Sequence, residues 1–180
     1  MRPIKLCSLA LPALFVMLAA CHSGPERDRY APPVQRQPMI GPDTSRVKHF
    51  IAMNDPDAEQ HLLRDVRGLE ANHYRWTAQR PLLRFVLPVT EHLKFTADFA
   101  VNGEAFKATG PFHIQYFVNG RELANELYDA PGEKHFEKDV PAAWLVKGGD
   151  TVVAMEIDKV YTAADGAKLG VTLVRAGFKD

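Results

Sequence analysis

Apolar and polar residues alternate with a period of two along much of the chain after residue 46. The clearest run sets an apolar series against a polar one: Leu93, Phe95, Ala97, Phe99 and Val101 against Lys94, Thr96 and Asp98. The same alternation returns at residues 112–118 and 153–157. Because successive side chains of a strand point to opposite faces, this pattern predicts half-buried β-strands.

Turn signals separate these runs. Asn102-Gly103 and Asn119-Gly120 each follow a valine at the end of an alternating run, and Asn-Gly is a strong signal for a two-residue hairpin. Residues 141–145 suit a single helical turn because Pro141 fits its start. Short strands at this spacing predict a β-sandwich or a barrel. We expect about eight to ten strands, near residues 47–52, 61–67, 72–78, 81–87, 92–101, 112–118, 121–128, 133–140, 151–160 and 168–178.

Several segments resemble a known family. They are Val140-Pro141-Ala142-Ala143-Trp144-Leu145, residues 149–157, residues 168–173, Tyr74-Arg75-Trp76-Thr77 and Leu83-Arg84-Phe85. Together they are similar to galactose-binding-like jelly-roll domains, including modules appended to some bacterial glycosyltransferases. The resemblance covers about residues 66–178. It implies an all-β fold, an antiparallel jelly-roll β-sandwich, and a role in binding or as a scaffold.

The N-terminus has the layout of an export signal. Arg2 and Lys5 precede an apolar run, residues 6–18, that is shorter than the roughly 20 residues of a membrane-spanning helix. The following Leu18-Ala19-Ala20-Cys21 resembles the lipobox of bacterial lipoproteins, in which the cysteine carries the lipid. We therefore expect residues 1–20 to be a signal peptide and Cys21 to be the lipidated first residue of the mature chain.

A proline-rich stretch separates Cys21 from the alternating runs. Residues 22–45 contain five prolines among charged and small residues, and they show no hydrophobic period. Such a composition does not bury enough apolar surface to fold. We expect residues 21–45 to form the lipidated cysteine and a disordered tether, and residues 46–180 to form one β-sandwich domain. His22, which replaces the aspartate common in retained lipoproteins, favours the outer membrane of the bacterial cell envelope, facing the periplasm.

Composition excludes several functions. The full chain has 22 basic and 22 acidic residues, so it lacks the basic excess of a nucleic-acid-binding surface. No serine follows Ser45 and no cysteine follows Cys21, which removes serine and cysteine nucleophiles from the domain. No nucleotide-binding or zinc-protease motif is present. The sequence therefore predicts no cofactor and no enzyme of these types.

Two groups of residues are candidate sites. Asp55, Asp57 and Glu59 alternate along residues 54–59 and could supply oxygen ligands to calcium, although the segment lacks the glycine and distal glutamate of an EF-hand and also suits an acidic turn shaped by Pro56. Tyr74, Trp76 and Trp144 could stack on sugar rings.

The alternative for each tryptophan is packing. Trp76 is expected to fill the core beside Phe85, and Trp144 either stacks on a ligand or caps one end of the sandwich. Tyr74 and Trp76 lie two residues apart, so on a strand they share one face.

The sequence therefore indicates a lipid-anchored envelope protein with a non-catalytic, monomeric binding or scaffold domain. Its partners are the membrane, through the lipid, and a glycan or an envelope protein. The alternative is a glycan-processing enzyme of unfamiliar type, because 22 acidic residues leave room for a carboxylate pair.

Replacing Cys21 tests the anchor. We expect the protein expressed in a bacterial host to fractionate with membranes, because several acyl chains at about 0.8 kcal/mol per buried CH₂ make attachment stable. The variant Cys21→Ala should lose both the acyl mass and the membrane association, measured by mass spectrometry and fractionation. A soluble, unacylated wild-type protein would contradict the prediction.

Overall fold

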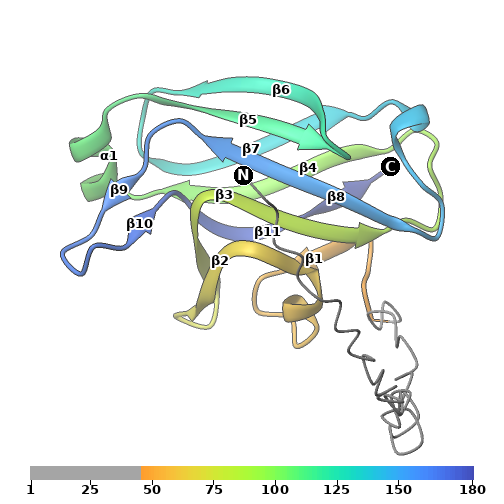
Figure 1. Ribbon diagram of the computed structural model, residues 1–180, viewed down its shortest axis with the longest axis horizontal. Coiled ribbons are helices and arrows are strands. Elements are labelled where there is room, and N and C mark those ends of the chain that lie inside the picture. The colour runs from red at the N-terminus through yellow and green to blue at the C-terminus, as the bar shows by residue number, and fades with distance from the viewer. Residues whose placement is uncertain (1–45) are drawn as a thin grey trace, which may run out of the picture. The chain divides into compact units, whose positions relative to one another are not determined.

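The computed structural model describes residues 46–180 (Figure 1). The predicted signal peptide, Cys21 and the tether lie outside the described residues. Within residues 46–180, no helix is both long and apolar enough to cross a membrane. The elements are β1 (Phe50–Ala52), η2 (Ala58–His61), β2 (Leu62–Glu70), β3 (Tyr74–Val86), β4 (Lys94–Val101), α1 (Gly103–Thr109), β5 (Phe112–Val118), β6 (Arg121–Tyr128), β7 (Gly132–Asp139), η3 (Ala142–Trp144), β8 (Asp150–Ile157), β9 (Tyr161–Thr162), β10 (Lys168–Leu169) and β11 (Thr172–Lys179).

Nine of the strands form one hydrogen-bonded sheet, and seven of them follow one another in a single path. Its order is β6-β5-β8-β3-β11-β4-β7, with β1 added beside β11 and β2 beside β3. The pairings between these strands are antiparallel. The expected all-β antiparallel fold is confirmed. Residues 46–180 contain eleven strands rather than the expected eight to ten, and the two-residue strands β9 and β10 form a separate pair.

Strand β3 belongs to two layers. Its first residues, Arg75 and Trp76, pair with β11, whereas Leu82 to Val86 pair with β8. Pro81, which has no N–H to donate, lies between the two paired parts. The path therefore folds into two sheets, β6-β5-β8-β3 and β3-β11-β4-β7, and Figure 1 shows β5 and β8 in front of β4 and β7. The expectation of two separate strands, 72–78 and 81–87, is wrong because this strand continues through the change of partner.

The core lies between these two sheets. The ring of Tyr116 on β5 stacks on that of Phe136 on β7, with centroids 3.7 Å apart and planes 6° from parallel. Phe85 on β3 meets Phe178 on β11 edge to face at 5.6 Å. Since β5 and β7 lie near opposite ends of the path, their stacked rings show that the sheets face each other as a sandwich. Burial raises the pKa of the Tyr116 hydroxyl, which lies 2.7 Å from that of Tyr128.

The two Val-Asn-Gly sequences fold differently. Asn119 and Gly120 both have positive φ, 49° and 77°, and they join β5 to β6 as a two-residue hairpin, as predicted. The hairpin expected at Asn102-Gly103 is wrong. Asn102 is extended and caps α1, with its side-chain oxygen accepting two backbone N–H groups of the first turn at 2.9 and 3.1 Å. Asparagine suits both a cap and a turn, so the local sequence does not distinguish them.

The C-terminal strand is shorter than expected. The segment 168–178 divides at Gly170, so that β10 pairs with β9 and β11 enters the sandwich. The N–H of Gly170 donates to the carbonyl of Thr77 at 2.8 Å, and a Cβ at this position would lie 2.7 Å from the Ala78 carbonyl oxygen. The predicted helical turn is confirmed as η3, and the buried Leu145 follows it.

Strand β7 is the last strand at one end of the path, and its exposed side chains are mostly charged. Five of its eight side chains are both exposed and polar or charged: Glu133, His135, Glu137, Lys138 and Asp139. Lys94 of the neighbouring strand bonds Glu137 at 3.0 Å. Charged side chains on an edge strand disfavour its pairing with another chain.

The two Asn-Gly sequences supply a matched test of backbone conformation. Gly120→Val should destabilise the protein by about 1–3 kcal/mol, because a β-branched residue tolerates positive φ poorly. Gly103 begins α1 without positive φ, and a Cβ added there would have no atom within 4 Å, so Gly103→Val should cost less than about 0.5 kcal/mol. Urea unfolding followed by circular dichroism measures both. Equal losses in the two variants would contradict the assignment.

Candidate functional site

The outer face of the β3-β11-β4-β7 sheet contains a groove of about 740 Å³. We call it the β11–β4 groove. Residues of β1, β3, β4, β7 and β11 line it, and the adjoining turns add Asn54 and His73. Its polar and aromatic lining residues include Asn54, Tyr74, Asp98, Glu133, His135 and Arg175.

Strand register brings the charged groups of this groove together. Asp98 on β4 lies opposite His135 on the adjacent strand β7 and opposite Arg175 on the other adjacent strand, β11. The ring Nδ1 of His135 lies 2.5 Å from one Asp98 carboxylate oxygen, and Nε of Arg175 donates to the other. Three residues distant in the chain thus form one network across three strands.

Asp98 is held ionised by this network. Burial on its own raises the pKa of Asp98, but the hydrogen bonds from His135 and Arg175 outweigh it and keep the pKa below its ordinary value. A carboxylate only accepts hydrogen bonds, so Nδ1 of His135 carries the proton. Because Arg175 uses Nε for this bond, its terminal amino groups have no hydrogen bond within residues 46–180.

Two aromatic residues lie along the same face. Tyr74 and Trp76 are both half-buried on β3, while Arg75 and Thr77 between and beyond them are buried. Tyr74 lines the groove, and Trp76 pairs with Thr172, another lining residue. The prediction that the two rings share a face is therefore confirmed.

The expectation that Trp76 fills the core is wrong. The aromatic neighbours of Phe85 are His61, Phe95 and Phe178, and Trp76 is not part of the core cluster. The reason lies in Arg75, which takes the inward position of β3 and so turns Trp76 outward. The resemblance to known jelly rolls suggested that Trp76 points inward, and it did not reveal that Arg75 takes the inward position.

Buried Arg75 fixes one wall of the groove. Its Nε donates to the carbonyl of Met53 at 3.0 Å, and a terminal nitrogen donates to a carboxylate oxygen of Glu59 at 2.7 Å. The same nitrogen lies 3.3 Å from the carbonyl oxygen of Arg67. These bonds satisfy a cation whose side chain is only 7% exposed, and they tie residues 53–59 to β3.

The carboxylates proposed as calcium ligands have other partners. Lys48 Nζ lies 3.0 Å from Asp55 and 3.4 Å from Asp57, and Glu59 is bonded to Arg75. Asp55 also accepts the backbone N–H of Asp57 at 2.8 Å. Within residues 46–180 no group of three or more His, Cys, Asp or Glu side chains is arranged to hold a metal ion. The geometry favours the alternative interpretation, an acidic turn.

Trp144 lies at one end of the sandwich, away from both aromatic residues of β3. Its ring is half-buried against the core cluster, and the guanidinium of Arg121 lies 5.8 Å from the ring centroid. Its carbonyl accepts a hydrogen bond from the Asn119 side chain at 2.7 Å. These contacts favour the capping role over ligand stacking.

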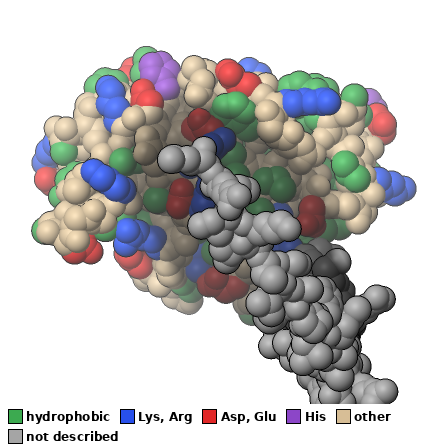
Figure 2. Space-filling view, in the orientation of Figure 1, with side chains coloured by type: hydrophobic (Ala, Val, Ile, Leu, Met, Phe, Trp, Pro, Cys, Tyr) green, Lys and Arg blue, Asp and Glu red, His purple; other side chains and the backbone are tan. Residues whose placement is uncertain are grey.

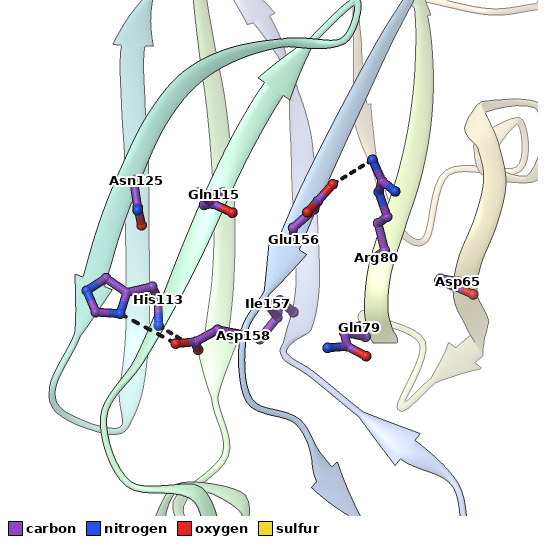
Figure 3. Close-up of a pocket in the computed structure, with 9 residues that line it drawn as sticks. All are labelled: Asp65, Gln79, Arg80, His113, Gln115, Asn125, Glu156, Ile157 and Asp158. Atoms are coloured by element: carbon purple, nitrogen blue, oxygen red, sulfur yellow. Dashed lines mark hydrogen bonds and ion pairs between the residues drawn. The ribbon is translucent and has the colours of Figure 1, made fainter.

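A second groove lies on the outer face of the other sheet (Figure 3). We call it the β5–β8 groove; its volume is about 540 Å³. Polar side chains line it, and they come from β2, β3, β5, β6 and the end of β8. The two grooves share no lining residue. The sequence analysis named none of these residues as candidates.

Comparisons with known proteins give distant similarities of structure. No family model matches the chain, and no curated protein matches it. A family 35 carbohydrate-binding module from an environmental isolate has 9% identity and a TM-score of 0.44, over 67% of this chain and 87% of that chain. A family 35 module from Clostridium thermocellum has 10% identity and a TM-score of 0.42, over 67% and 92%. The fold itself follows from the strand pairing and core contacts described above.

Trp144 is tested by its effect on stability. Trp144→Ala should destabilise the protein by about 2 kcal/mol, roughly half the loss for emptying a fully buried aromatic site. Trp144→Phe keeps an apolar ring and should recover most of the loss. Thermal melts measure both variants. Unchanged stability in Trp144→Ala would contradict the capping role.

Proposed function

We propose that the domain is a non-catalytic glycan-binding module and that the β11–β4 groove is its binding site. One observation carries the proposal: half-buried Tyr74 and Trp76 lie beside a network of planar charged side chains on the same face. A sugar ring has an apolar face and a rim of hydroxyls. Ligand sites combine an apolar contact surface with a few precisely placed polar groups, and this groove supplies both.

The polar groups suit hydroxyls as ligands. The Asp98 carboxylate accepts hydrogen bonds, whereas the free amino groups of Arg175 donate them, so both roles of a hydroxyl are met within one groove. Hydrogen bonds to ionised groups are stronger than neutral ones. His135 and Arg175 hold Asp98 in one orientation, which lowers the entropy lost on binding.

The same network supports binding without catalysis. A glycosidase needs a carboxylic acid whose pKa is raised, so that it can donate a proton to the leaving oxygen. The central carboxyl of this groove has a lowered pKa, so Asp98 itself does not suit the role of this acid. Residues 46–180 also contain no serine or cysteine nucleophile.

The proposed setting is the bacterial envelope. In it, a lipid on Cys21 anchors the protein, and residues 22–45 hold the domain at a distance. About 25 residues span on the order of 25–30 Å as a flexible coil and up to about 75 Å when extended by proline. Such a reach would present the groove to glycans of the envelope on the periplasmic side of the outer membrane.

The aromatic pair tests the site. Full-length protein in detergent is screened against an oligosaccharide array and against peptidoglycan sacculi. The double variant Tyr74→Ala/Trp76→Ala should bind at least about tenfold more weakly, because two aromatic contacts together contribute about 1.4 kcal/mol or more. Tyr161→Ala removes a half-buried tyrosine outside the groove and should bind as the wild type does.

Two results would overturn this proposal. The first is binding that the aromatic double variant leaves unchanged. The second is hydrolysis of an envelope polysaccharide by the wild type that is lost in Asp98→Asn or Glu133→Gln. The second outcome would establish the alternative, a glycan-processing enzyme.

A further inference from the structure

The β5–β8 groove contains a row of polar side chains that crosses four strands. Gln115 on β5 pairs with Asn125 on β6 on one side and with Glu156 on β8 on the other. Arg80 on β3 continues the row, because its terminal nitrogen lies 2.6 Å from a carboxylate oxygen of Glu156. Figure 3 shows these four side chains side by side. Neighbouring strands lie about 4.8 Å apart, so the row is about 14 Å long.

Much of the hydrogen-bonding capacity of this groove is unused. The side chains of Gln79, Gln115 and Asn125 make no hydrogen bond with any other group in residues 46–180. Each amide offers two donor hydrogens and an accepting oxygen. Gln115 is half-buried at the centre of the row, and Gln79 and Asn125 are exposed, so all three amides are accessible to a ligand in the groove.

A hydrogen-bonded pair borders one end of the groove. Asp158 accepts the backbone N–H of His113 at 2.8 Å, and its other oxygen lies 3.5 Å from the ring Nδ1 of the same residue. Figure 3 shows this pair beside the amide row. The pair joins the end of β8 to the start of β5 and so fixes the side chains that border the row.

A strained residue borders the opposite side. Asp65 has φ of 59°, a left-handed conformation that is uncommon outside glycine, and the register of β2 against β3 shifts on both sides of it. Bulges of this kind redirect a side chain, and backbone strain gathers at binding sites. Asp65 is among the residues that line the groove.

The spacing of the row favours a glycan over a peptide. An extended peptide advances about 3.3 Å with one residue and about 6.6 Å with two, and neither length matches the strand spacing of about 4.8 Å. A chain of linked pyranose rings repeats at a distance close to that spacing. The groove is lined by no Phe, Tyr or Trp side chain, so its contacts would be made with hydroxyl edges rather than with ring faces.

From these observations we infer that the β5–β8 groove is a second glycan site, in which a sugar chain runs across the strands with one ring near each polar side chain. Figure 2 looks onto the side of the domain that carries β5 and β8, where both acidic and basic side chains are visible. The site stands independently of the β11–β4 groove. If the β11–β4 groove also binds a glycan, as proposed above, the domain bridges two glycan chains from opposite faces of the sandwich.

The experiment separates the two grooves. Full-length protein in detergent is titrated by calorimetry with cellotetraose, xylotetraose and chitotetraose. In the double variant Gln115→Ala/Asn125→Ala, the affinity of the β5–β8 groove for the tetrasaccharide should fall at least tenfold. The variant Tyr74→Ala/Trp76→Ala should lose binding in the β11–β4 groove, and combining all four substitutions should abolish binding in both. Glu122→Ala, an exposed change on β6 outside the groove, is the control, and thermal melts verify folding.

Each outcome decides the inference. Binding to at least one tetrasaccharide that depends on Gln115 and Asn125 supports it, even when the aromatic variant has no effect and the proposed site on the other face fails. No binding that depends on these two residues overturns it. Binding of extended decapeptides, lost in Gln115→Ala/Asn125→Ala, also overturns it and assigns the groove to peptides.

Discussion

Four hydrogen bonds join Thr77 to the segment Gly170–Val171, at the point where β3 leaves one sheet for the other. Two are made by backbone groups, at 2.8 and 2.9 Å, and two by the buried Thr77 hydroxyl, which donates to the Val171 carbonyl at 3.1 Å and accepts its N–H at 3.0 Å. Backbone groups that lose their ladder partners in a buried place cost free energy unless another group satisfies them. The hydroxyl of Thr77 supplies an acceptor for the N–H of Val171 and a donor for its carbonyl at the point where β3 changes sheets.

A single strand therefore contributes to both faces of the sandwich. Before the change of partner, β3 places Tyr74 and Trp76 on the outer face of one sheet, and after it the same strand places Arg80 on the outer face of the other. The strain at Asp65 on neighbouring β2 lies close to the same point in the register. The two grooves thus depend on one local irregularity that is built into β2 and β3.

Sequence patterns revealed the strands better than the sites. Period-two alternation located β4, β5 and β8, and it placed Asp98 on the polar face, because side-chain alternation is a local property of a strand. The link from Asp98 to His135 and Arg175 depends on register between distant strands, which no local pattern contains. The prediction for Trp76 was wrong for a related reason. In a strand that alternates aromatic and polar residues, either set of side chains can face the core. Here the bonds of Arg75 to residues 53–67 decide that Arg75 faces inward and Trp76 outward.

The charged edge at β7 has a consequence for crowding. A protein anchored by lipid is confined to a surface, where its copies meet far more often than the same number of molecules in solution. An open, apolar edge strand would then polymerise the domains into continuous sheets. The exposed acidic and basic side chains of β7 oppose such pairing along this edge. With the proposed lipid anchor in place, many copies could then lie close together on one membrane without pairing through β7.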